Sequence, residues 1–188
     1  MEPIWIKNYP PGVPAAVELD AGQTLVSLAE NSVRDYADRP SFACMGKTLS
    51  YRELDQASRA FAAWLQQSGL EPGTRLAIML PNVLQFPIAL FGALRAGMTV
   101  VNVNPLYTAR ELEHQLTDSG AEAIVILANF ASVLEKVIDR TSVRTVIVTE
   151  FGDLLGFPKA FIVNSVLRYV KKMVPAYDLP GHWRFTEI

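Results

Sequence analysis

Few side chains of this 188-residue chain are of the types that act as nucleophiles, proton-transfer groups or metal ligands: it has one cysteine, Cys44, and two histidines, His114 and His182. One cysteine excludes an internal disulfide and a cysteine-based metal site. Two histidines are too few for an ordinary histidine-rich zinc site. His114 ends a Glu-Leu-Glu-His stretch typical of a solvent-exposed helix face, and Cys44 alternates with Phe42 in an apolar run, as a small buried residue would. We therefore predict no catalytic residue and no metal ligand.

The stretch Gly46-Lys47-Thr48 is similar to the end of a phosphate-binding P-loop. The first glycine of such a loop would stand at position 41, where the chain has Ser41, and no helix is expected to begin at the lysine. The three residues are instead typical of a β-hairpin. The sequence also lacks the G-x-G-x-x-G dinucleotide fingerprint and the G-x-S-x-G nucleophile elbow.

Asparagine follows several predicted strands, and this pattern gives the candidate binding residues. In an open parallel sheet, ligands bind beyond the carboxyl ends of the strands. Asn104, with Pro105 and Tyr107 just after it, and Asn129 occupy such positions. The alternative is that these asparagines only cap the helices that follow them.

The elements that position these residues are predicted by hydrophobic spacing. Apolar residues at helical intervals predict helices over about 25–36, 51–67, 82–96, 108–119 and 130–140. Two capping boxes, Ser50 with Glu53 and Thr108 with Glu111, mark helix starts. Pro87 should kink its helix or delay its start. A hairpin is expected over 41–51, and apolar runs at 75–80, 99–103, 123–127 and 145–149 predict strands buried on both faces. We predict an α/β fold with helices packed on a mainly parallel sheet, preceded by two helices and a short β-hairpin.

Composition sets the broad class of the protein. Half of the residues are hydrophobic and 17 basic residues face 19 acidic ones, so the chain can bury a core and does not have the basic excess of a nucleic-acid-binding protein. It begins with no signal peptide and has no apolar run long enough to cross a membrane, so we expect a cytoplasmic protein. We divide it into an extended arm (1–22), an α/β unit (23–150) and a basic helical segment with a connector (151–188).

Residues 157–177 carry four basic residues and no acidic one, whereas the rest of the chain is net acidic. We expect a helix over about 161–174 with one apolar face and with Arg168, Lys171 and Lys172 on the other. Such a helix suits the surface of an anionic membrane. The alternative is an ordinary helix that packs on the core or on further protein.

A family resemblance covers essentially the whole chain. Thr48-Leu49-Ser50-Tyr51-Arg52-Glu53-Leu54 resembles the T-x-x-Y-x-E-L opening of the adenylate-forming (AMP-binding) superfamily, and Pro72-Gly73-Thr74-Arg75-Leu76-Ala77 with Leu80-Pro81-Asn82 resembles its P-G-D-R-V-A…L-P-N segment. The stretch from Asn104 to Leu116 is especially similar to bacterial long-chain fatty-acid–CoA ligases, a group of acyl-CoA synthetases.

The resemblance implies a two-step reaction: a fatty carboxylate attacks the α-phosphate of ATP with Mg²⁺, and CoA then displaces AMP. It places the CoA channel beside Asn104, Pro105, Tyr107 and Asn129. The family's phosphate loop, acidic motif and C-terminal lid would follow Ile188. We therefore expect the N-terminal fragment of such a ligase, inactive alone, with self-association through exposed apolar surface. The alternatives are a free-standing α/β ligand-binding module and a peripheral membrane adaptor.

Overall fold

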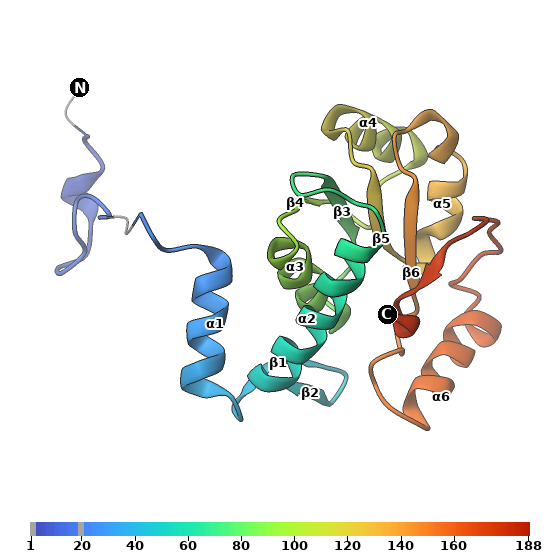
Figure 1. The fold of residues 1–188 in the computed structure, drawn as a ribbon, viewed down its shortest axis with the longest axis horizontal. Helices are drawn as coiled ribbons and strands as arrows, with labels where there is room; N and C mark the ends of the chain where they lie inside the picture. Colours follow the sequence, from blue (N-terminus) through green and yellow to red (C-terminus); the bar gives the residue numbers. More distant parts are fainter. Residues whose placement is uncertain (1–2, 19–20) are drawn as a thin grey trace.

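The computed structural model describes residues 3–18 and 21–188. An N-terminal arm with one 3₁₀ turn, η1 (Ile6–Asn8), extends away from the body (Figure 1). The first α-helix, α1 (Leu25–Tyr36), begins where expected, because the Thr24 side chain accepts a hydrogen bond from the Ser27 backbone N–H. The rest of the chain forms an α/β body beside this helix (Figure 1).

The predicted hairpin is confirmed as β1 (Pro40–Cys44) paired antiparallel with β2 (Lys47–Ser50). Its turn residues Met45 and Gly46 both have positive φ, 47° and 75°, which suits a two-residue hairpin loop. The P-loop-like stretch therefore begins in a turn and continues into a strand. Cys44 is half-buried at the edge of the core rather than fully buried, because the hairpin covers the body with one side only.

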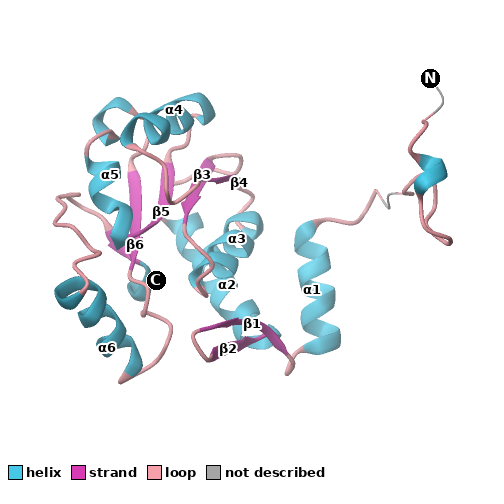
Figure 2. Ribbon diagram, turned by 180° about the vertical axis from the view of Figure 1, so that it is seen from behind, coloured by secondary structure: helices cyan, strands magenta, loops and turns pink. Residues whose placement is uncertain are grey.

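Helices α2 (Tyr51–Gln67) and α3 (Gln85–Arg95) cover one face of the sheet (Figure 2). The Ser50–Glu53 capping box opens α2 as predicted. Helix α3 begins three residues later than Asn82, so Pro87 occupies its first turn, where a missing N–H costs nothing. The two helices approach closely at Gly92, where a Cβ atom would lie 2.7 Å from Phe61.

All four predicted core strands are confirmed as members of a parallel sheet. Its order is β4-β3-β5-β6-β7, with bounds β3 (Arg75–Met79), β4 (Thr99–Asn102), β5 (Ala123–Leu127), β6 (Thr145–Thr149) and β7 (Trp183–Arg184). Every residue of β5 is buried, as expected for a central strand covered on both faces. Along β3, Leu76 and Ile78 join the α2–α3 core, while Ala77 and Met79 join the core on the opposite face.

The opposite face is covered by α4 (Ala109–Ser119) and α5 (Ala131–Glu135) (Figure 2). The prediction of one continuous helix over 130–140 was wrong. The segment is divided into η2 (Ala128–Phe130), α5 and η3 (Ile138–Arg140). At Val137 the backbone leaves the helical region, with φ −129°, and this side chain is 1% exposed in the core. Burial of Val137 is therefore favoured over continuation of the helix.

The C-terminal segment departs most from expectation. Helix α6 (Lys159–Ser165) continues as a π-helical turn, η4 (Val166–Val170), and ends before Val174. Strand β7 then joins the sheet, followed by η5 (Phe185–Glu187). Phe185 is 7% exposed and its ring stacks 5.3 Å from that of Phe61, because β7 carries it beneath α2. No helix in the described ranges is long and apolar enough to span a bilayer.

Candidate functional site at the carboxyl edge of the sheet

Asn104 lies in the loop that follows β4, at the carboxyl edge of the sheet. Its side-chain oxygen accepts a hydrogen bond of 3.0 Å from the Leu106 backbone N–H, and its backbone oxygen accepts one from Tyr107. Asn104 thus shapes its own loop, and it does not cap the following helix as the alternative states, because the N-cap of α4 is Thr108. Pro105 is half-buried, and Tyr107 packs against the core beneath α4. The loop holds its side chains in fixed positions at the sheet edge.

Asn129 follows β5 and connects the sheet to the C-terminal segment. Its side-chain nitrogen donates to the backbone oxygen of Met173 over 2.9 Å. Its side-chain oxygen is buried and has no hydrogen-bond partner. A buried acceptor without a donor is costly unless a ligand or water supplies one. This oxygen is therefore the strongest sign of a binding role among the four candidate residues.

The four candidates share one edge of the sheet without forming a single cluster. Strand β3 lies between β4, which leads to Asn104 and Tyr107, and β5, which leads to Asn129. Neighbouring strands are about 4.8 Å apart, so the two groups are separated by roughly 10 Å. That separation fits two points along an extended ligand better than one small anion.

A polar pocket at the end of β6 was not predicted from the sequence. It has a volume of about 330 Å³ and is lined by Val148, Thr149, Glu150, Asp153, Asn164, Arg168, Tyr177, His182, Arg184 and Thr186. The Gln85 side-chain nitrogen, from α3, donates to Thr149 Oγ1 over 3.0 Å and to the Glu150 backbone oxygen over 2.9 Å. The pocket thus joins the sheet, α3, α6 and the C-terminal strand.

The charges in the polar pocket are mostly paired. Arg168 donates to Glu150, and this hydrogen bond raises the pKa of the Arg168 guanidinium. Asp153 accepts hydrogen bonds from Thr149 Oγ1, the Glu150 N–H and Asn164 Nδ2 at 2.7–3.1 Å. Such saturated groups hold the segment in place rather than act in proton transfer. Sequence periodicity could not find the contacts of Gln85 with this pocket, because its partners lie 64 and 65 residues away in the chain.

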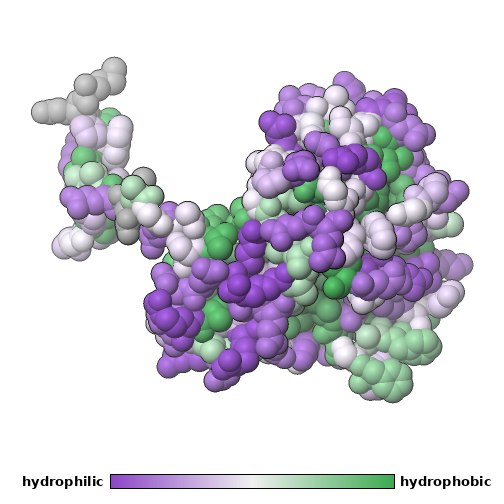
Figure 3. Space-filling model, viewed as in Figure 1, coloured by the Kyte–Doolittle hydropathy of each residue, from purple (hydrophilic) through white to green (hydrophobic). Residues whose placement is uncertain are grey.

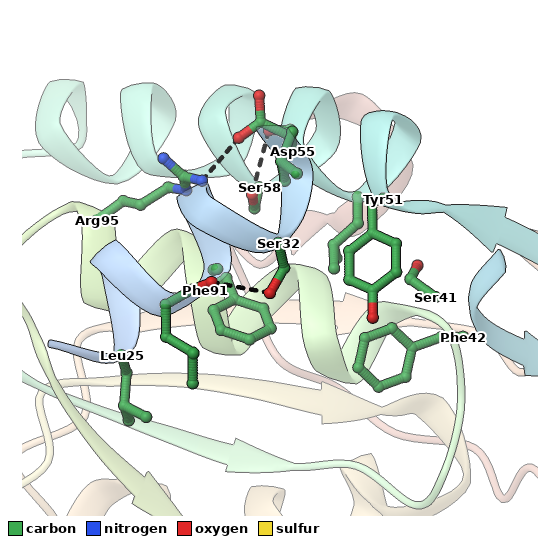
Figure 4. Close-up of a pocket in the computed structure, with 13 residues that line it drawn as sticks. Leu25, Ser32, Ser41, Phe42, Tyr51, Asp55, Ser58, Phe91 and Arg95 are labelled. Atoms are coloured by element: carbon green, nitrogen blue, oxygen red, sulfur yellow. Dashed lines mark hydrogen bonds and ion pairs between the residues drawn. The ribbon is translucent and has the colours of Figure 1, made fainter. Parts of the chain in front are cut away.

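A second pocket, of about 210 Å³ and mostly apolar, lies between α1, α2, α3 and β1 (Figure 4). Arg95 forms its polar end. The Arg95 side chain is only 8% exposed and contacts Asp55 at 2.7 Å and Glu30 at 2.9 Å. These ion pairs join α1 to the two helices of the body.

The remaining candidates have structural positions. His114 is exposed on α4, as predicted. The backbone N–H of Thr108 donates to the Glu111 carboxylate, which lowers the pKa of Glu111 and fixes the start of α4. Within the part of the chain that the structure describes, no three His, Cys, Asp or Glu side chains are grouped closely enough to hold a metal ion.

The fold and the sequence together define the class of protein. The AMP-binding enzyme family matches residues 29–166, which is most of the chain, so the chain belongs to this family. Its fold is shared with the anthranilate CoA ligase AuaEII (TM-score 0.70, 14% identity, 90% of this chain and 28% of that one). It is also shared with a long-chain-fatty-acid-CoA ligase from Archaeoglobus fulgidus (TM-score 0.67, 20% identity, 84% and 32%).

Within that family, the chain is similar to curated long-chain-fatty-acid–CoA ligases. It is 57% identical to the enzyme of Yersinia pestis over 189 aligned residues, 100% of this chain and 34% of the relative. It is 52% identical to the enzyme of Haemophilus influenzae over the same shares, and 36% identical to that of Bacillus subtilis over 82% of this chain and 28% of the relative. The chain thus spans about a third of the length of these relatives.

Proposed function

We propose that this chain is the N-terminal third of an ATP-dependent long-chain fatty-acid–CoA ligase. The observation that carries the proposal is the 57% identity along the whole chain with the Yersinia pestis ligase. In the proposed reaction, a fatty carboxylate oxygen attacks the α-phosphorus of ATP and pyrophosphate leaves. The thiol sulfur of CoA then attacks the acyl carbon, its proton is lost, and AMP leaves with the bond electrons.

The chain supplies scaffold for this reaction and not its phosphate chemistry. Transfer at a phosphate needs positioned donors and a metal ion to offset the developing charge. Among the described residues, no three His, Cys, Asp or Glu side chains form a group that could hold a metal ion, and Gly46-Lys47-Thr48 lies in a hairpin. We place the residues that hold ATP and Mg²⁺ in the remaining length of the protein, and we expect this chain alone to be inactive.

The CoA channel is proposed to run along the carboxyl edge of the sheet, past Asn104, Pro105, Tyr107 and Asn129. Two features support it. The roughly 10 Å between the two groups suits the extended pantetheine arm of CoA. The unpartnered Asn129 oxygen offers an acceptor to an amide N–H of that arm.

The test uses the longer protein, with palmitate, ATP and CoA, and follows palmitoyl-CoA, AMP and pyrophosphate. We expect Asn104→Ala and Tyr107→Ala to raise the KM for CoA, because both residues define the loop after β4. His114→Ala is the matched control on the exposed side of the next helix. Loss of thioester formation in His114→Ala alone, with normal Asn104→Ala and Tyr107→Ala variants, would contradict the channel.

We further propose that the protein works in the cytoplasm, at the inner face of the membrane, where its apolar substrate is concentrated. The basic, acid-free stretch 157–177 supports attachment to anionic lipid.

A homodimer is also proposed, since the arm exposes the apolar side chains of Ile4, Trp5 and Val17, each 60–78% accessible. Gel filtration of the longer protein tests the dimer, and a monomer at all concentrations would contradict it.

A further inference from the structure

Helix α6 and the turn η4 face the body with a mixture of polar and smaller apolar residues, and most of their large apolar residues face solvent. The side chains turned inward follow helical spacing and are half-buried: Ala160, Val163, Asn164, Leu167 and Arg168. The outward side carries large apolar residues, each 38–73% exposed: Phe161, Ile162, Val166, Tyr169, Val170 and Met173. We call these six residues the outer face. A helix that packs on its own core normally has the opposite arrangement.

Hydrogen bonds fix the helix in this orientation. The Asn164 side-chain oxygen accepts from the Gly152 N–H at 2.7 Å, and its nitrogen donates to Asp153 at 3.1 Å. At Gly152 any side chain would collide with this helix, because a Cβ atom would lie 2.7 Å from Asn164. Arg168 pairs with Glu150 one turn further along. Rotation that buried the outer face would break all of these contacts.

The charge around the outer face is positive only. Residues 154–177 contain no Asp or Glu. Lys159 lies at one end of the helix, where it contacts the Met45 backbone oxygen, and Lys171 and Lys172 are exposed at the other end. Arg168, which the sequence had placed on this surface, is turned away and paired. Figure 3 shows the apolar side chains gathered at the lower right, where Figure 1 places α6.

We propose that the outer face is a docking surface for an anionic lipid bilayer, with α6 and η4 lying parallel to the membrane plane. This proposal rests on the proposed function, which places the protein at the inner face of the membrane. It adds which residues make the attachment. Twelve helical residues extend about 18 Å, which suits a helix in the headgroup region and is too short to cross the apolar interior. Lysines at both ends would contact lipid phosphates while the aromatic and aliphatic side chains enter the interface.

The experiment measures sedimentation of the chain, and of the longer protein, with phosphatidylcholine vesicles that contain or lack phosphatidylglycerol. Both proteins should bind only the anionic vesicles. Lys171→Gln with Lys172→Gln should lower the partition coefficient about 25-fold, since each lysine near such a surface is worth about fivefold. Phe161→Ser with Tyr169→Ser should weaken binding at every salt concentration. High salt should weaken binding of the unmodified chain, because the screening length falls to about 3 Å at 1 M.

Matched controls remove equal charge or equal exposed apolar surface elsewhere. Lys47→Gln with Lys136→Gln, and Tyr9→Ser with Val13→Ser, should bind as the unmodified chain does, and circular dichroism verifies folding of each variant. Equal binding by outer-face and control variants would overturn the proposal. Binding by the chain but not by the longer protein would overturn it too, because further protein would then cover the outer face.

The same variants separate this proposal from the proposed function. The longer protein is assayed for palmitoyl-CoA formation with palmitate delivered on serum albumin, without vesicles. If the longer protein is fully active in this assay but the outer-face substitutions leave vesicle binding unchanged, the docking surface alone is rejected. No activity there, with binding that follows the outer face, would reject the ligase alone.

Discussion

At the scale of single residues, close contacts between α2 and α3 set the limits on substitution. Gly92 faces Phe61 and the Ser58 backbone oxygen, and an added Cβ would lie 2.7 and 2.9 Å from them. One of these partners is backbone, which cannot move aside without shifting the helix. Close packing of α2 and α3 therefore requires glycine at position 92 because there is no room for a Cβ atom, and not because the backbone has a special conformation there.

We predict that Gly92→Ala lowers the free energy of unfolding by about 1–3 kcal/mol, despite the higher helix propensity of alanine, because overpacking forces the helices apart. Urea unfolding measures this change. Ala63→Gly, on the exposed side of α2, serves as a control for helix propensity without a change in packing. An unchanged or higher stability of Gly92→Ala would show that the helices are farther apart than the structure places them.

The capping carboxylate of Glu111 makes stability depend on pH. Its hydrogen bonds with Thr108, from the backbone first and the hydroxyl second, lower its pKa in the folded state below the ordinary value of 4.5. A lowered pKa gives stability that is present above the ordinary value and is lost as pH falls through the folded value. Glu111→Gln should therefore be less stable than the unmodified chain at pH 7.

The difference between Glu111→Gln and the unmodified chain should disappear on acidification, since both side chains are then neutral. The midpoints of urea unfolding, measured for both proteins from pH 7 down to below the ordinary glutamate pKa of 4.5, give this difference. Glu135→Gln, on the exposed side of α5, is the control and should show no such convergence. A constant difference across this range would mean that the cap does not titrate with the fold.

Among single-residue contacts, those between neighbours in the sequence could be predicted and those between distant residues could not. Capping boxes at Ser50 and Thr108 could be predicted, because both partners lie within three residues. The roles of Gln85 and Arg95 could not, because their partners are 40 to 65 residues away. Such pairs depend on which elements become neighbours, and periodicity does not contain that information.

At the scale of elements, α1 is attached to the body through a small ion-pair network rather than through a buried face. None of the described residues of α1 is fully buried, and Leu25 and Leu28 remain 60% and 50% exposed. Arg95 contacts Glu30 of α1 and Asp55 of α2 from its largely buried position. Arg59 of α2 also contacts Glu30, at 3.4 Å, so the ion pairs that hold α1 converge on Glu30, with Arg95 as the more closely placed and more buried partner.

We predict that Arg95→Met destabilises the chain by about 3 kcal/mol, because removal of one partner leaves the mostly buried Asp55 with less compensation. Removal of one partner of a buried ion pair costs roughly 3–5 kcal/mol. Because Arg59 also pairs with Asp55, we expect a loss at the lower end of that range. Hydrogen exchange should show faster exchange in α1. Arg34→Met, whose ion pair with Asp35 is exposed, is the control, and equal effects of the two would contradict the network.

Element prediction succeeded for the core strands and for the capped first helix, and it failed for the orientation of α6. The strands 123–127 and 145–149 and the helix 25–36 have the predicted bounds. For α6, the sequence predicted one apolar face and left open whether that face meets a membrane or packs on protein. Hydrogen bonds of Asn164 and Arg168 to the body determine its orientation. Hydrophobic spacing gives the faces of a helix but does not state which face contacts the protein.

At the scale of the whole molecule, the order of elements could be predicted and the closing strand could not. Strand β7 has two residues, too few for any periodic signal. It returns the C-terminal segment to the sheet, so residues 151–188 share the core of the preceding unit. The candidate site is likewise distributed, with parts from loops after β4, β5 and β6 that only the sheet brings to one edge.

We expect this chain to provide scaffold to the proposed fatty-acid–CoA ligase and to perform no adenylation alone. ATP–pyrophosphate exchange with palmitate, in the absence of CoA, isolates the first half of the proposed reaction. We predict palmitate-dependent exchange for the longer protein and exchange equal to a protein-free blank for residues 1–188. Exchange by residues 1–188 clearly above that blank, or none by the longer protein, would contradict it.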